Sequence, residues 1–267
     1  MIPAPLEYKR ATTLEDALEA LADPEAAVLA GGQSLVPVLK LRLARPSVLV
    51  DIGGLGLGGV TVEDGEVRIG ALTTWDELLR NLSLARPELR AIHECAYGIG
   101  DLQVRNRGTV GGSMAHADPA SDFAAVALAF AGSIRLRSPA GERSVEARDF
   151  FLGPFTTAIA QQELLTEVVV PVPESGSGSA YVSVEHPASG FPLAGAAALV
   201  RPSGSPSVAV TGVGSHAFLL PDGDPAGVDG AEIFGDHFAS ADYRRHLARV
   251  VVGRALERAA SRAGEVT

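Results

Sequence analysis

Cysteine is almost absent from this chain, because Cys95 is the one cysteine among 267 residues. A single thiol excludes a disulfide within the chain. It also excludes a four-cysteine zinc site or an iron–sulfur cluster held by this chain alone, because each of these centres needs several thiolates. We expect Cys95 to be a buried helix residue.

The chain also lacks a basic balance and a long apolar run. It has 22 Lys and Arg against 32 Asp and Glu, a net charge of -10, which argues against a general nucleic-acid binder. Its longest apolar stretch, residues 123–134, is shorter than the ~20 residues that cross a bilayer. The N-terminus has no basic start followed by an apolar segment, so we expect a cytoplasmic protein with no membrane span.

A nucleophile–base arrangement is missing as well. The six histidines are scattered and the nucleophile motif GxSxG does not occur. His116 and Asp118 lie close together, but two ligands without a third do not make a metal site. If this protein performs chemistry, we expect the reactive group to come from a cofactor.

The hydrophobic pattern predicts both strands and helices along the chain. Residues 27–30 read as a buried strand, and Asp64-Gly65 predicts the turn of a hairpin. Residues 123–131 predict a helix that is apolar nearly all round, and residues 243–262 predict a long final helix. Prolines and small polar residues at 171–179 indicate either a domain linker or a long surface loop.

One glycine run, residues 54–59, matches the dinucleotide-binding pattern GxGxxG. That motif needs a helix directly after the glycines, since the helix N-terminus holds the pyrophosphate. Here the following residues alternate like a hairpin. We therefore interpret this match as an accidental glycine-rich loop.

Two other glycine clusters are better candidates for binding a diphosphate. The sequence AGGQS occupies residues 30–34, and TVGGS occupies residues 109–113. Paired glycines let backbone amides turn toward an anion, and the flanking hydroxyls add donors. Asp122 follows at the start of the apolar helix, as an N-cap or as an acceptor for ribose or ribityl hydroxyls. The basic run 103–108 leads into the second cluster.

These two clusters resemble the signatures of a known family. AGGQS matches AGG-x-S, and residues 109–122, TVGGSMAHADPASD, match T-x-GG-x-x-x-x-ADP-x-x-D. Both are typical of the medium, FAD-binding subunit of the molybdenum hydroxylases, the carbon monoxide dehydrogenase and xanthine dehydrogenase family. The resemblance extends over nearly the whole chain, including residues 39–46, 99–109, 163–167 and 243–249.

The resemblance implies a fold, a function and partners. The fold is a PCMH-type FAD-binding domain of two α+β subdomains at residues 1–172, then a C-terminal domain with a three-stranded antiparallel sheet and helices at 178–267. The implied function is that of an oxidoreductase subunit. Its FAD receives electrons from [2Fe–2S] clusters on a small subunit, fed by a molybdenum cofactor on a large subunit, and passes them to an external acceptor. The implied assembly is a dimer of heterotrimers.

The resemblance also assigns site residues. The two clusters wrap the pyrophosphate, Asp122 binds hydroxyls of the FAD chain, Ile99 and Leu165 lie against the flavin or its chain, and Phe191 lies near the isoalloxazine ring. The predicted cofactor-binding residues are Val28, Leu29, Ala30, Gly31, Gly32, Gln33, Ser34, Leu35, Ile99, Thr109, Val110, Gly111, Gly112, Ser113, Asp118, Asp122, Leu165 and Phe191.

The chain departs from the family pattern at Ser183, where many relatives carry a lysine in a Tyr-x-Lys arrangement. A cation near the flavin favours its reduced, anionic form. We therefore expect a lower flavin potential or weaker FAD binding, which the potential and FAD affinity of a Ser183→Lys variant would test.

Two alternative functions remain open at this point. One is a free-standing FAD oxidoreductase that acts on its own organic substrate, which would need an acid or base beside the flavin. The other is a dinucleotide-binding or assembly protein without turnover.

Overall fold

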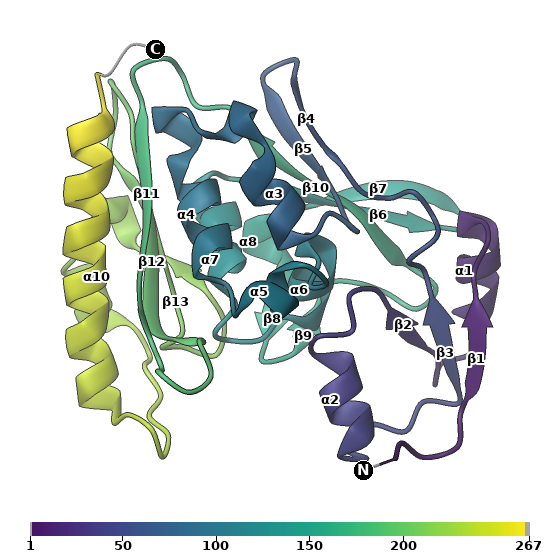
Figure 1. The fold of residues 1–267 in the computed structure, drawn as a ribbon. Helices are drawn as coiled ribbons and strands as arrows, with labels where there is room; N and C mark the ends of the chain where they lie inside the picture. Colours follow the sequence, from purple (N-terminus) through teal and green to yellow (C-terminus); the bar gives the residue numbers. More distant parts are fainter. Residues whose placement is uncertain (1, 265–267) are drawn as a thin grey trace.

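The N-terminal part of the computed structural model, which describes residues 2–264, is a small parallel sheet. Its strands are β1 (Glu7–Arg10), β2 (Ala27–Leu29) and β3 (Val48–Asp51), in the order β1-β3-β2. Helices α1 (Leu14–Ala20) and α2 (Leu35–Lys40) connect them (Figure 1). The α1 N-terminus is fixed by a capping box in which Thr13 and Asp16 satisfy each other's backbone N–H groups.

The central part is an antiparallel sheet in the order β4-β5-β10-β6-β7. The Asp64-Gly65 turn predicted from the sequence joins its first two strands, and both residues have positive φ. The strands are β4 (Val60–Glu63), β5 (Glu66–Gly70), β6 (Ser133–Ser138), β7 (Gly141–Glu146) and β10 (Leu164–Pro171).

Helices cover this central sheet and carry most of its core. Every residue of α7 is buried, as its apolar sequence predicted, and Cys95 is fully buried in α4. The helices are α3 (Trp75–Arg80), α4 (Arg90–Gly98), α5 (Leu102–Arg105), α6 (Val110–His116), α7 (Asp122–Ala129) and α8 (Ala147–Phe150), followed by the short pair β8 (Phe151–Gly153) and β9 (Thr156–Thr157).

The C-terminal part is an antiparallel sheet between helices. Three long strands, β11 (Gly178–Glu185), β12 (Pro192–Val200) and β13 (Ser207–Thr211), are joined at the edge by the two-residue β14 (Phe218–Leu219). The short helix α9 (Gly227–Gly230) and the long helix α10 (Ala241–Arg262) complete it. The α10 helix begins two residues earlier than the sequence suggested, since Ser240 caps it by accepting from the Tyr243 N–H.

Alternate residues of the C-terminal strands serve two different cores. On β12, Ala196 and Ala198 belong to the core shared with α10, whereas Ala197 and Leu199 belong to the core of α4 and α7. This alternation follows from the period of two in a strand. The segment predicted as a linker contains the loop from β10 to β11, and one core continues across it. The division at residues 172 and 178 therefore stays a prediction.

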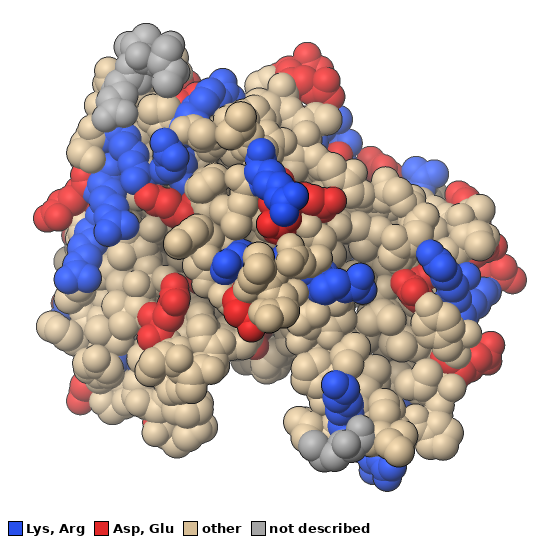
Figure 2. Space-filling view, viewed as in Figure 1, with Lys and Arg blue, Asp and Glu red and all other residues tan. Residues whose placement is uncertain are grey.

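The surface is hollowed between α2 and the C-terminal sheet (Figure 2). On the face shown, acidic and basic side chains are interspersed, with basic side chains gathered along α10. None of the helices within residues 2–264 combines the length and apolar character needed to cross a bilayer.

Candidate dinucleotide-binding site

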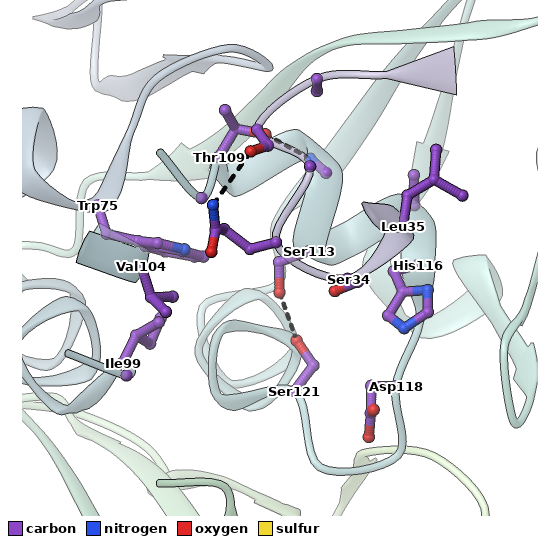
Figure 3. A pocket seen from close by; sticks show the side chains of 18 of the residues that line it. Ser34, Leu35, Trp75, Ile99, Val104, Thr109, Ser113, His116, Asp118 and Ser121 are labelled. Atoms are coloured by element: carbon purple, nitrogen blue, oxygen red, sulfur yellow. Dashed lines mark hydrogen bonds between the residues drawn. The ribbon is translucent and has the colours of Figure 1, made fainter. Parts of the chain in front are cut away.

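A cavity of about 580 Å³ lies between the turn after β2, helix α6, the start of α7 and the loop from β11 to β12. This volume is within the range of ligand pockets, roughly 300–1,000 Å³. Most of the predicted site residues line it (Figure 3). These are Val28, Ala30, Gly31, Gly32, Gln33, Ser34, Leu35, Ile99, Thr109, Gly112, Ser113, Asp118, Asp122 and Phe191.

Residues 30–35 form the first wall of the cavity. Among residues 2–264, the N–H groups of residues 31–34 form no hydrogen bond. Gly32 has φ +76°, a left-handed conformation that glycine adopts without steric cost. A row of unpaired amides around such a residue is an anion-binding nest, so this wall fits a pyrophosphate.

The first wall is fixed from behind by close backbone packing. A Cβ on Gly31 would overlap the carbonyl of Arg107, so only glycine fits there. Arg105, from the same basic run, donates through Nη1 to the carbonyls of Tyr97, Ile99 and Gly100 at 3.1–3.3 Å. Arg105 therefore holds the loop that carries Ile99.

Residues 109–122, the second wall, use their amides differently from what the sequence predicted. The Val110 N–H donates to the Thr73 carbonyl at 2.9 Å, and the Gly111 N–H donates to the Ala71 carbonyl at 2.9 Å. The Gly112 N–H donates to the Thr109 hydroxyl, which caps α6, at 3.1 Å. These amides are already paired, so this wall offers side chains to a ligand.

The polar side chains of the second wall cluster where α7 begins. The hydroxyls of Ser113 and Ser121 lie 3.1 Å apart, and Asp118 accepts from the Ala120 N–H at 2.8 Å. Asp122 is 9% exposed, and burial raises its pKa to about 7. The Tyr181 hydroxyl donates to Asp122 Oδ1 at 2.5 Å and opposes that rise.

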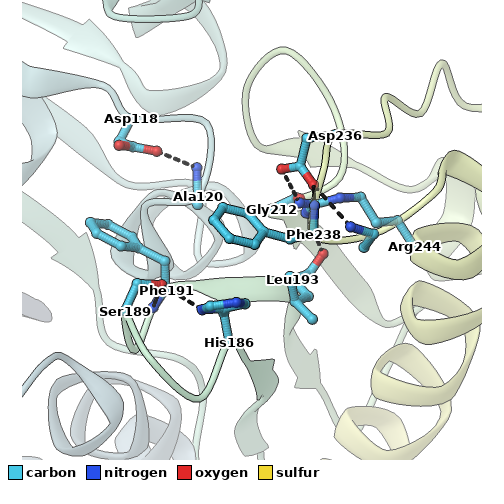
Figure 4. Close-up of polar contacts among 11 residues, drawn as sticks. Asp118, Ala120, His186, Ser189, Phe191, Leu193, Gly212, Asp236, Phe238 and Arg244 are labelled. Carbon is cyan, nitrogen blue, oxygen red and sulfur yellow. Dashed lines mark hydrogen bonds and ion pairs between the residues drawn. The ribbon is translucent and has the colours of Figure 1, made fainter.

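Phe191 lines the cavity, and two further aromatic rings lie close to its loop. Phe191, half-exposed, follows Ser189 in the loop from β11 to β12 (Figure 4). The ring of His186, in the same loop, lies 4.3 Å from the ring of Phe238. Phe238 follows Asp236, which pairs with Arg244 of α10 at 2.6 Å. Helix α10 thus holds the segment that packs against this loop.

Four of the predicted site residues do not line the cavity. Leu165 is 4% exposed within β10 and packs in the core of the central sheet. Val110 and Gly111 are buried where α6 packs against residues 71–73, and Leu29 ends β2 behind the first wall. Ser183, the position without the family's lysine, has its hydroxyl 3.3 Å from Glu185 Oε1.

Sequence reasoning missed several lining residues. Trp75 lines the cavity beside Ile99 and Val104 (Figure 3), and its position as the one tryptophan, directly after the capping residue Thr74, was the available signal. The others are Ala27, Val38, Gly100, Val104, Gly108, Ala115, His116, Ser121, Ser189 and Gly190. The glycine-rich loop 54–59 leads into strand β4 and not into a helix, as the alternating residues after it predicted.

A nest of amides, a buried carboxyl group and apolar side chains around one cavity are the groups that suit a dinucleotide. Residues 4–173 match the family described as "FAD binding domain in molybdopterin dehydrogenase", and the chain belongs to this family. Its cofactor is therefore FAD. The resemblance recognised from the two glycine signatures is confirmed.

Related proteins agree with this assignment. The chain is 41% identical to the glyceraldehyde dehydrogenase medium chain of Sulfolobus acidocaldarius over 77% of this chain and 73% of the relative. It is 34% identical to the carbon monoxide dehydrogenase medium chain of Afipia carboxidovorans, over 98% and 99% of the two chains. The structure of carbon monoxide dehydrogenase from Hydrogenophaga pseudoflava matches with a TM-score of 0.93 at 34% identity, over 98% of this chain and 100% of that chain. The chain is thus an FAD-binding, electron-transferring oxidoreductase subunit of the molybdenum hydroxylase type.

Proposed function

We propose that this chain carries electrons within a three-component complex, from iron–sulfur clusters on a small subunit to an external acceptor. A large subunit with a molybdenum cofactor is the source of the electrons, and the assembly is a dimer of heterotrimers. FAD supplies the redox chemistry in this chain, because it exchanges electrons with both kinds of partner. The one cysteine of the chain supports this division of labour, since the clusters need other thiolates.

The observation that carries the placement of FAD is the row of amides in residues 31–34, which line the cavity and have no hydrogen-bond partner within the described part of the chain. Such a row is suited to the negative charges of a pyrophosphate. The carboxyl group of Asp122 is suited to hydroxyl donors of the ribityl or ribose chain, and Ile99 and Phe191 give an apolar place for the flavin ring. Pyrophosphate, hydroxyl chain and ring each have matching protein groups around one cavity.

The proposed location of the complex is the cytoplasm. Cys95 is buried and unpaired, which is compatible with a reducing compartment. Relatives named as medium chains of carbon monoxide dehydrogenase and glyceraldehyde dehydrogenase belong to enzymes of more than one chain, which supports a hetero-oligomer.

The test is to purify the full chain, record its absorption spectrum and ask what reduces the bound chromophore. We expect a yellow protein that is reduced only when its partner subunits and their substrate are present. Direct reduction by a small organic molecule would favour a free-standing oxidoreductase. A chain that takes up no FAD, alone or with its partner subunits, would contradict the proposal.

A further inference from the structure

The C-terminal sheet holds the part of the second wall that carries Asp122. The Thr211 hydroxyl, at the end of β13, lies within hydrogen-bond distance of two carbonyls, 2.9 Å from that of Ser121 and 3.1 Å from that of Pro119. The Gly212 N–H donates to the same Pro119 carbonyl at 3.0 Å. Residues 119–122 are therefore fastened from the C-terminal side of the molecule, although they precede it by about ninety residues.

Tyr181 completes this connection with a side chain. It lies on β11, is 4% exposed, and donates its hydroxyl to Asp122 Oδ1 at 2.5 Å. The neighbouring strand makes room for it, because a Cβ on Gly195 would overlap the Tyr181 hydroxyl. The Tyr181 N–H donates to Glu94 Oε2 of α4 at 2.9 Å, which fixes the backbone at the same residue. The position of Tyr181 is thus fixed by a hydrogen bond at its backbone N–H and by another at its side-chain hydroxyl.

The hydrogen bond from Tyr181 to Asp122 lies in a buried environment that disfavours the charged form of the aspartate. Besides Tyr181, the titratable groups that face Asp122 are Cys95 on α4, Glu185 on β11 and Asp118 on its own loop. Glu185 and Asp118 raise the pKa of Asp122 further, while the Tyr181 hydroxyl lowers it. A hydrogen bond to a charged acceptor is about twice as strong as a neutral one, so Tyr181 favours the charged form that accepts from ligand hydroxyls.

We propose that Tyr181 is a positioning residue of the FAD site, which acts through its hydrogen bond to hold the Asp122 carboxylate as an acceptor for the cofactor. The C-terminal sheet then contributes to FAD affinity by a hydrogen bond behind the cavity, in addition to the loop from β11 to β12 that lines it. This inference rests on the proposed placement of FAD beside Asp122. It adds that FAD affinity depends on pH and that Tyr181 sets the pH at which it changes.

The first measurement needs no cofactor. The full chain is labelled with ¹³C at the aspartate carboxyl carbon, and the Asp122 resonance is assigned by its absence in Asp122→Asn. Its titration is then followed in the wild-type chain, Tyr181→Phe and Tyr243→Phe. Tyr181→Phe should move the Asp122 midpoint upward by about one pH unit, a tenfold change in the proton equilibrium. Tyr243→Phe, at an exposed tyrosine of α10, should leave the midpoint unchanged.

The second measurement uses FAD itself, with its dissociation constant determined from pH 6 to pH 9. In the wild-type chain affinity should rise with pH through the Asp122 midpoint. In Tyr181→Phe the loss should be up to about tenfold near pH 7 and should be largely recovered at pH 9. Asp122→Asn should remove the pH dependence in both backgrounds.

The outcomes separate the two proposals. An unchanged Asp122 midpoint in Tyr181→Phe, or an equal loss of FAD affinity at pH 6 and pH 9, overturns the role of Tyr181. A shifted midpoint together with FAD binding that does not depend on pH supports the action of Tyr181 on Asp122 and overturns the placement of FAD beside that carboxyl group.

Discussion

The two walls of the cavity carry nearly the same glycine-serine sequence and use it in opposite ways. In the first wall, residues 31–34 line the cavity and their amides form no hydrogen bond with any residue from 2 to 264. In the second wall, the amides of Val110 and Gly111 pair with residues 71–73, and the ligand side consists of hydroxyl and carboxyl groups. Paired glycines thus either leave backbone amides free for a ligand or let two backbone segments pack closely. The segments that pack against the glycines in the folded protein determine which of these two roles they have.

The largest effect expected from this comparison concerns the carboxyl group of the second wall. The folded-state pKa of Asp122 is about 7, above its ordinary value of 3.8, so the native state binds more protons than the unfolded state between these pH values. Stability therefore falls as pH rises through this window, by up to about 4 kcal/mol above pH 7. Asp122→Asn should remove this loss.

The measurement is the free energy of unfolding of the full chain without FAD, from pH 4 to pH 8, for both proteins. The difference between Asp122→Asn and the wild-type chain should grow in favour of the variant as pH rises. Two curves that stay parallel would show that the folded protein does not raise the pKa of this carboxyl group, and the second wall would then present a carboxylate at neutral pH.

The next largest expected effect is a loss of stability when Gly111, a tightly packed glycine of the second wall, is replaced. A Cβ on Gly111 would lie 2.6–2.7 Å from Ala71, including its backbone, so Gly111→Ala should cost about 3 kcal/mol of stability. The matched control is Gly253→Ala in α10, where a Cβ meets nothing within 4 Å. That variant should be neutral or stabilised by up to about 1 kcal/mol. Denaturant titration of both checks this, and equal stabilities would contradict the packing role.

Local structure was predictable where the signal lay within a few residues. The Thr13–Asp16 capping box, the Asp64-Gly65 turn and the all-apolar α7 helix each depend on neighbours in the sequence. The family signatures identified the cavity for the same reason, since each is a continuous segment.

Long-range pairing could not be predicted in this way. The hydrogen bond from Tyr181 to Asp122 joins residues 59 positions apart, and the use of the Gly111 amide depends on Ala71. The family resemblance, which includes residues 163–167, assigned Leu165 to the flavin or its chain. The side chain of Leu165 is instead buried in the central sheet. The tryptophan after Thr74 could be noticed in the sequence, but its place in the cavity depends on the packing of α3 beside α5 and on the hydrogen bond from the Trp75 N–H to the Gly108 carbonyl.

The smallest effect on stability, and the sharpest test of the first wall, comes from Gly32. Its φ of +76° costs an alanine about 1 kcal/mol of stability. Gly32→Ala should also disturb the alignment of the amides, so we expect the FAD dissociation constant to rise about tenfold, which corresponds to roughly 1.4 kcal/mol. The control is Gly56→Ala, in the glycine-rich loop 54–59, where φ is +66° and a Cβ meets nothing within 4 Å. This variant carries similar backbone strain outside the cavity, without the contacts to Val36 and Leu29 that a Cβ on Gly32 would make at 3.1 and 3.3 Å, so it should lose no more stability than Gly32→Ala and keep its FAD affinity. If both variants bind FAD as the wild-type chain does, the amides of the first wall do not hold the pyrophosphate, and the two walls differ in packing alone.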